Sequence, residues 1–159
     1  MAIRFSEDKQ QILHFLTKHQ AGVLATASAA GRPHAATVYF SVDDKLNFYF
    51  VTKEDTTKHH NLQANPYAAL AVHDAASQAT VQATGQAKQL DRDDPRAQHV
   101  FNEIVHAAQT TGQSVVPPIS QLPAGKYVTY RFTPARIRLA EFNHESNDGH
   151  EKLFDEVTI

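Results

Sequence analysis

Three consecutive segments in the first third of the chain have the composition of strands, with only short turns between them. They cover residues 23–28, 32–42 and 46–52. In the second segment every other residue from Ala36 to Val42 is apolar and would share one face. A period of two is typical of a half-buried strand, and short turns join antiparallel neighbours. The pattern therefore predicts an antiparallel meander.

Four further segments have the composition of strands, and they lie at residues 67–73, 79–90, 126–132 and 136–142. Gly85, in the longest of them, predicts a bulge or a close backbone approach. Regular helical crossovers are missing between the strands, which argues against a parallel doubly wound sheet. We expect a mainly β protein of about six or seven strands, closed as an antiparallel barrel because closure removes exposed sheet edges.

Three helices are expected to pack outside this barrel. The first opens at Ser6-Glu7-Asp8 and extends to about residue 20, and the last begins at Pro95 with an apolar stripe at helical spacing. A length of 159 residues fits a single domain, residues 1–159, with its core at residues 22–142.

Two segments near the C-terminus have no clear period. Residues 110–125 hold three of the seven prolines, yet the part from Val115 to Ile119 is apolar for a loop. It must be covered by the parent domain or by a second subunit. The tail, residues 143–159, is polar with a weakly amphipathic end.

Composition excludes several classes of protein. The chain has no cysteine, so disulfides, thiolate metal sites and a cysteine nucleophile are excluded. Its formal net charge is -2, so no basic surplus predicts binding to nucleic acid or to an anionic membrane. No apolar run approaches the ~18 residues of a membrane span, and MAIRFSEDKQ lacks the apolar core of a signal peptide. A soluble cytoplasmic protein is the default expectation.

One stretch, FYFVTKEDTTKHHNLQANP at residues 48–66, joins a strand to a short helix that Pro66 ends. Asp55 or Thr56 can cap this helix, and Thr57 and Lys58 fall in its first turn. Free backbone N–H groups, hydroxyls and one ammonium then converge at a helix N-terminus, which favours an anion and in particular a phosphate. The alternative is an ordinary capped helix whose lysine faces solvent.

Other chemistries have less support. Adjacent His59 and His60 diverge by about 100° on a helix, and His99 and His106 lie about 10 Å apart along one, so no metal site is expected. A Ser/His/Asp triad is not excluded by composition, but no Gly-x-Ser-x-Gly passage supports it. The sequence also lacks a GxGxxG fingerprint and a Walker loop. We assign no catalytic side chain.

Three passages carry a resemblance to a known family. They are Gly31-Arg32-Pro33-His34 before a long alternating strand, the stretch at residues 48–66, and Tyr130-Arg131-Phe132-Thr133-Pro134. Together they resemble the flavin-binding split β-barrel proteins related to pyridoxamine 5′-phosphate oxidase, over about residues 22–142. The resemblance implies an antiparallel split barrel that forms a homodimer, with flavin mononucleotide (FMN) in two clefts at the subunit interface.

The resemblance also implies which positions meet the cofactor. Val51 and Thr52 would approach the flavin and its ribityl chain, and Thr57 and Lys58 would hold the phosphate. Backbone groups of the strand would face the isoalloxazine ring, and one threonine stands where the oxidases place a glutamine that reaches the flavin. The strand positions are Ala36, Thr37 and Val38, and the threonine at the glutamine position is Thr80.

This chain departs from the oxidases at several positions. Ala36 and Ser41 stand where the oxidases have an arginine and a lysine, and Thr57 replaces a further arginine. FMN would then be held by less positive charge, with Arg32 and Lys53 as candidate substitutes. The residues after Phe142 also lack the oxidases' run of arginine, leucine, histidine, aspartate and arginine. The chain is therefore more similar to the general-stress and uncharacterised branches, and pyridoxamine phosphate is doubtful as its substrate.

Three hypotheses follow for function. The first is an FMN-dependent oxidoreductase that acts on a small organic substrate. The second is a non-enzymatic protein that holds FMN, a deazaflavin or haem for sensing, storage or stress response. The third is a structural dimer with an empty cleft.

Overall fold

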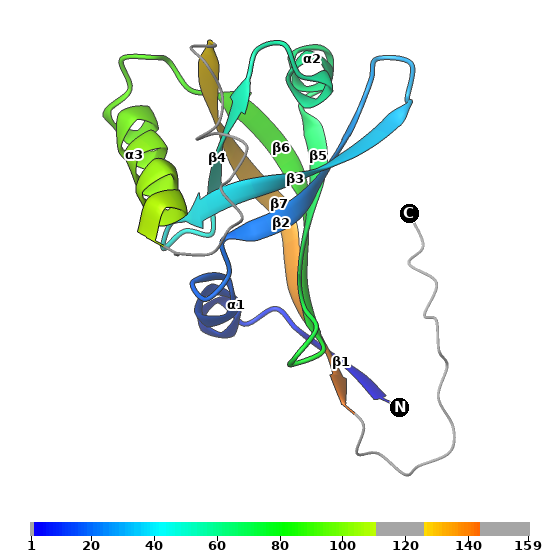
Figure 1. The fold of residues 1–159 in the computed structure, drawn as a ribbon. Helices are drawn as coiled ribbons and strands as arrows, with labels where there is room; N and C mark the ends of the chain where they lie inside the picture. The colour runs from blue at the N-terminus through cyan, green and yellow to red at the C-terminus, as the bar shows by residue number, and fades with distance from the viewer. Residues whose placement is uncertain (1, 111–125, 144–159) are drawn as a thin grey trace.

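The computed structural model describes residues 2–110 and 126–143, which form seven strands and three helices (Figure 1). The strands are β1 Ala2–Ser6, β2 Ala21–Ala27, β3 Pro33–Val42, β4 Phe48–Lys53, β5 Tyr67–Asp74, β6 Ala79–Gln89 and β7 Tyr127–Asn143. The helices are α1 Lys9–Leu16, α2 Thr57–Ala64 and α3 Pro95–Thr110. The expected apolar loop at residues 115–119 and the polar tail beyond Asn143 lie outside the described residues.

The strands close into a barrel. The sheet order is β1-β7-β4-β3-β2-β5-β6, and β6 also pairs with β7, so six strands close and β1 lies outside them. Every pairing is antiparallel. The predicted antiparallel barrel with outer helices is thus confirmed.

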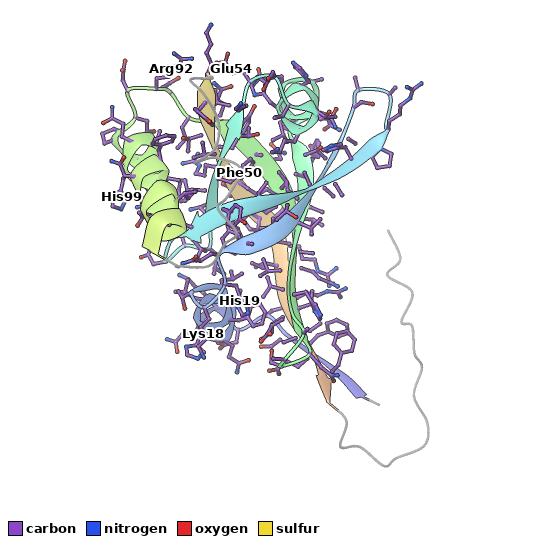
Figure 2. The ribbon with its side chains drawn as sticks, in the orientation of Figure 1. Lys18, His19, Phe50, Glu54, Arg92 and His99 are labelled. Carbon is purple, nitrogen blue, oxygen red and sulfur yellow. The ribbon has the colours of Figure 1, made fainter. Side chains whose placement is uncertain are left out.

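Four aromatic side chains from β4 and β7 lie together in the barrel interior. Phe50 stacks on Tyr130 with ring centroids 5.4 Å apart, and Phe48 lies 5.8 Å from Phe132. Figure 2 shows Phe50 at the centre of the barrel. Burial of large apolar side chains on this scale is the main stabilising term of such a fold. The alternation of β4 therefore sends its even-numbered residues inward.

The three helices close the barrel in different places. Ile12 and Leu16 of α1 and Leu62 of α2 join the same hydrophobic core, and Figure 1 shows these two helices at opposite ends of the barrel. Helix α3 lies outside, where Val100 and Ile104 pack on the outward side chains of β4. The predicted stripe of α3 therefore forms a second, smaller core.

Gly85 lies at a bulge, as its position in the long strand predicts. The register between β6 and β7 shifts between Thr84 and Gly85. A Cβ atom added at Gly85 would lie 2.1 Å from the carbonyl oxygen of Thr133. Because no side chain fits this distance, only glycine lets the two backbones approach so closely.

Two strand predictions need correction. The segments expected at residues 126–132 and 136–142 are one continuous strand, β7, which runs through Pro134. Pro134 lies between the part of β7 that pairs with β4 and the part that pairs with β1, so its missing N–H breaks neither of those ladders. The short strand β1 was not expected, and α1 begins only at Lys9, with Asp8 as its N-cap.

Among the described residues, no helix is both long enough and apolar enough to span a lipid bilayer.

Candidate functional site

The turn between β4 and α2 is held by hydroxyl groups. Thr56, the N-cap of α2, donates to the carbonyl oxygen of Lys53 (2.8 Å) and accepts from the backbone N–H of His59 (3.4 Å). Its only proton is thereby used, so the hydroxyl of Thr52 must donate to Thr56 across 3.1 Å. Of the two predicted caps, Asp55 and Thr56, the structure selects Thr56, and Thr52 locks the turn from inside the barrel.

Lys58 stands in the first turn of α2 with its side chain partly buried. Desolvation lowers the pKa of its ammonium from the ordinary value. No carboxylate of the described residues lies within ion-pair distance of it. A partly buried cation without an anionic partner, beside the free N–H groups of a helix start, fits an anion better than it fits solvent. Thr57 lies exposed beside it.

The N-terminal half of β3 has an open edge. β3 pairs with β2 over Pro33–Tyr39, but among the described residues it pairs with β4 only over Phe40–Val42. The N–H of Phe40 bonds to the carbonyl oxygen of Gln20 (2.9 Å), which directs the even-numbered residues of β3 toward β2. Alternation then turns the N–H and C=O groups of the odd-numbered residues toward the open edge.

The open edge of β3 determines which of the predicted positions on this strand could offer backbone groups to a ligand. The backbone groups of Ala36 and Val38 pair with β2, so Thr37 presents both backbone groups to the open edge. Beyond the edge stands the end of β4, where Thr52 and Lys53 pair with β7 alone. A slot bordered by unpaired backbone is suited to a flat ring with polar edges.

Two predicted positions lie differently. The side chain of Val51 is buried beneath α3 in the cluster with Val100 and Ile104, so only its backbone could meet a ligand. Thr80 on β6 pairs with His73 near the end of β5. His73 lies about 20 Å along β5 from Tyr67, the residue at which β5 begins after α2. The Thr80 hydroxyl bonds to Nδ1 of His73 (2.9 Å). One chain therefore does not bring Thr80 to Lys58.

The basic residues considered as substitutes are also separated. Lys53 ends β4, three residues before the Thr56 cap, and its carbonyl oxygen accepts from the Thr56 hydroxyl at the start of α2. Arg32 belongs to the exposed turn between β2 and β3, where its N–H bonds to the hydroxyl of Ser28 (3.1 Å). Ser41 lies in a pocket between α1 and α3. The ion pair of Arg92 with Glu54 (3.1 Å) ties the connection before α3 to the turn before α2 (Figure 2).

A partly buried polar network around the Tyr130 hydroxyl, beneath α2, was not predicted. The Tyr130 hydroxyl lies 3.0 Å from Nδ1 of His59 and accepts from Nε2 of Gln63 (2.9 Å), which also donates to Gln89 (2.8 Å). Burial raises the pKa of Tyr130. Burial, and then the neighbouring His60, lower the pKa of His59. The alternation of β7, which predicts Tyr130 inside the barrel, was the available signal for this network.

A second buried pair links α2 to the barrel wall. Nδ2 of Asn61 donates to the hydroxyl of Thr26 on β2 across 3.1 Å, and both side chains are buried. Because each group would cost free energy if it were left unpaired, this bond fixes where α2 sits on the barrel. The orientation of Lys58, three residues earlier, follows from it.

Comparison with known proteins identifies relatives. The family model described as pyridoxamine 5′-phosphate oxidase matches residues 8–140. A pyridoxine/pyridoxamine 5′-phosphate oxidase of Streptomyces avermitilis is 40% identical over 89 residues, which are 55% of this chain and 38% of that relative. The chain spans well under half the length of the curated relatives it matches.

Solved structures share the fold at low identity. An FAD-binding protein of Mesorhizobium loti matches with TM-score 0.68 and 18% identity, over 89% of this chain and 97% of that one. A heme storage protein, HutZ of Vibrio cholerae, matches with TM-score 0.59 and 17% identity, over 80% and 91%. An FMN-binding protein of Nostoc punctiforme, related to pyridoxamine 5′-phosphate oxidase, matches with TM-score 0.54 and 17% identity, over 84% and 80%.

The family match covers most of the chain, and the fold agrees with it. The chain belongs to the pyridoxamine 5′-phosphate oxidase family.

Proposed function

We propose that this chain is a cytoplasmic homodimeric flavoprotein that binds FMN between the start of α2 and the open edge of β3, and that it is an oxidoreductase for a small organic substrate. The observation that carries the proposal is Lys58, a partly buried ammonium at a helix N-terminus, unpaired with any described carboxylate. The FMN-binding relative with the same fold supports it.

The residues present fit FMN in their chemistry. Lys58, the Thr57 hydroxyl and the N-terminal N–H groups of α2 would hold the phosphate. The backbone of Thr37 would face the polar edge of the isoalloxazine ring, and Thr52 would position the turn through Thr56. Bound FMN would supply electron transfer, while these residues bind it, orient it and exclude water.

Thr80 fits only if a second copy contributes it, because it lies far from Lys58 within one chain. The outward faces of β2 and β5 support a homodimer. Val23 is 46% exposed and Tyr67 is 64% exposed, and Ala69 and Ala71 lie between them on the same face. An exposed face made of small and apolar side chains is typical of an interface.

The experiment is an absorption spectrum of the purified protein before and after incubation with FMN and desalting. We expect retained flavin bands at about one FMN per chain, because each chain has one such helix start. A colourless protein after desalting would contradict the proposal. Turnover of a nicotinamide donor with FMN bound then separates an oxidoreductase from a flavin or deazaflavin carrier.

Haem is the second candidate. The relation in fold to a heme storage protein favours it, and so does the exposed His60 in the first turn of α2, because histidine is a common axial ligand of haem iron. Titration with hemin would give a sharp Soret band in the wild type and a shifted or lost band in His60→Ala. Lack of any shift in the variant would exclude this ligand.

A further inference from the structure

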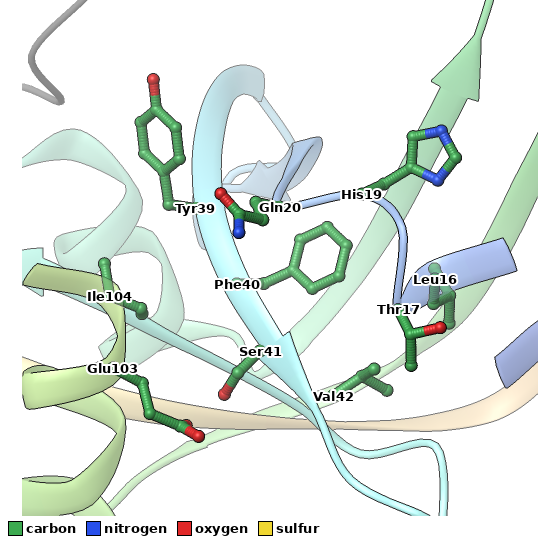
Figure 3. Close-up of a pocket in the computed structure, with 10 residues that line it drawn as sticks. All are labelled: Leu16, Thr17, His19, Gln20, Tyr39, Phe40, Ser41, Val42, Glu103 and Ile104. Carbon is green, nitrogen blue, oxygen red and sulfur yellow. The ribbon is translucent and has the colours of Figure 1, made fainter. Parts of the chain in front are cut away.

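A pocket of about 270 Å³ lies between the end of α1, the C-terminal half of β3 and α3 (Figure 3). It is separate from the start of α2. Its walls combine apolar side chains with polar ones, and two of the polar ones, Ser41 and Glu103, lie at one end. The apolar side chains are Leu16, Phe40, Val42 and Ile104. Apolar walls with a pair of convergent polar groups are typical of a small-molecule site, and the volume suits a single-ring molecule.

Ser41 has a buried hydroxyl that needs a partner. Its Oγ is inaccessible to solvent and forms no hydrogen bond to any described residue. A buried hydroxyl without a partner costs free energy comparable to a lost hydrogen bond. Figure 3 shows this hydroxyl and the carboxylate of Glu103 turned toward the same end of the pocket. A ligand with a hydrogen-bond donor there would satisfy the hydroxyl once rotation about the Cα–Cβ bond turns it into the pocket.

The charge of this end is negative. Among the described lining residues, Glu103 is the only carboxylate and none is a lysine or an arginine. One of its oxygens lies 3.1 Å from Nε2 of His99, and the other has no hydrogen-bond partner among the described residues, so it can accept one from a ligand. His19 faces elsewhere, since Nδ1 lies 2.7 Å from the carbonyl oxygen of Phe15 and Nε2 lies 3.8 Å from Asp74. The Thr17 hydroxyl already donates to His14.

We propose that this pocket binds a small organic amine, with its ammonium group toward Glu103 and Ser41 and its apolar part against Leu16 and Ile104. An ammonium supplies the donors that the Ser41 hydroxyl and the free carboxylate oxygen can accept, and it neutralises the single charge of the pocket. A carboxylate or phosphate ligand would instead face Glu103 with like charge. The inference does not depend on flavin binding.

The test uses three probes with the same ring and different head groups: benzylamine, benzyl alcohol and benzoate. Methyl ¹H–¹³C spectra of the protein without FMN report binding at Leu16, Val42 and Ile104. The methyl groups of Val81, fully buried in the barrel core, serve as the internal reference. We expect benzylamine to shift the three pocket residues saturably, benzyl alcohol to bind more weakly, and benzoate to produce no shift.

Two variants test the assigned contacts. Glu103→Gln removes the negative charge that faces the ammonium group of benzylamine. Because the Glu103 carboxylate is partly exposed, this change should weaken benzylamine binding only about threefold to fivefold. Ser41→Ala should weaken it about fivefold through loss of one hydrogen bond. Glu7→Gln, an exposed carboxylate outside the pocket, is the matched control and should leave the affinity unchanged. Equal binding of benzoate, shifts that avoid the pocket, or unchanged affinity in both pocket variants would overturn the proposal, as would failure of benzylamine to bind.

Discussion

Lys58 is the single side chain on which the proposed cofactor site depends most. Replacing it with alanine should weaken FMN binding by about one to two orders of magnitude, because a hydrogen bond to a charged group contributes about 1.5–3 kcal/mol. Quenching of flavin fluorescence on binding measures the affinity. Lys45→Ala, in the exposed turn between β3 and β4, is the control and should bind as the wild type does. Equal affinities of the two variants would remove Lys58 from the site.

Protonation of the His59 side chain should destabilise the folded protein at acidic pH. Neutral His59 can accept the hydroxyl proton of Tyr130, whereas protonated His59 leaves that proton without an acceptor among the described residues. Burial and His60 lower the pKa of His59, partly opposed by Glu54, so the unfolded chain binds the proton more readily. Stability should therefore fall as the pH drops below the ordinary histidine value and then level off below the lowered pKa.

Thermal unfolding of the wild type and His59→Gln between about pH 5 and pH 8 tests this linkage. Glutamine keeps a partner for Tyr130 but does not titrate. The wild type should lose melting temperature relative to the variant toward acid, and the two should run parallel above about pH 7. A constant difference over the whole range would mean that His59 titrates normally.

For single residues, the sequence predicted the features that depend only on residues nearby in the chain. The cap and Lys58 lie within one helical turn of each other, so local spacing was enough to place them. The contact of His59 with Tyr130 joins residues 71 positions apart, and that of Asn61 with Thr26 joins residues 35 apart. Such pairs depend on which strands become neighbours, which one sequence does not specify.

Among the elements, the pairing of β6 with β7 depends on Gly85. Gly85→Ala should destabilise the protein by about 1–3 kcal/mol, because the added methyl group would meet the carbonyl of Thr133 and the backbone around Pro134. Chemical denaturation in urea measures the change. Gly31→Ala tests whether the steric clash is the cause of the loss of stability at Gly85. Gly31 has φ +77° but no atoms within 4 Å of an added Cβ. Its cost should be smaller, about 1 kcal/mol, and purely conformational.

Element existence was predicted better than element boundaries. The alternation of β3 and β6 was visible because one face of each strand is more buried than the other. β7 was divided because Thr133-Pro134 has the chemistry of a turn, and only its place between two pairing partners makes the proline acceptable. β1 has five residues and pairs with β7 alone, outside the barrel, so its pattern is short.

At the scale of the whole molecule, the proposed homodimer places the cofactor positions of two chains together. Thr80 and Lys58 lie at different ends of one barrel, so the site as predicted is complete only when a second copy supplies Thr80. The outward face of β2 and β5 is the surface proposed for that contact. Sequence resemblance alone suggested the dimer, since no local pattern distinguishes a strand face that meets solvent from one that meets another chain.

Val23→Glu tests the dimer and the composite site together. The residue is 46% exposed and projects from β2 beside Ala71 and Thr37, so a carboxylate there should leave the fold intact but place two like charges in a twofold interface. We expect the wild type to sediment at twice the chain mass of 17.6 kDa and the variant to sediment as a monomer with FMN affinity reduced at least about tenfold.

Gln98→Glu is the matched control, because it adds the same charge at an exposed position of α3, which packs on β4 and not on the face of β2 and β5. It should remain dimeric and bind FMN as the wild type does. Sedimentation velocity and flavin titration on the same samples separate the possible results. A monomeric Val23→Glu that keeps full affinity would mean that one chain holds FMN unaided and that Thr80 has no part in the site. A wild type that is already monomeric would rule out the interface itself.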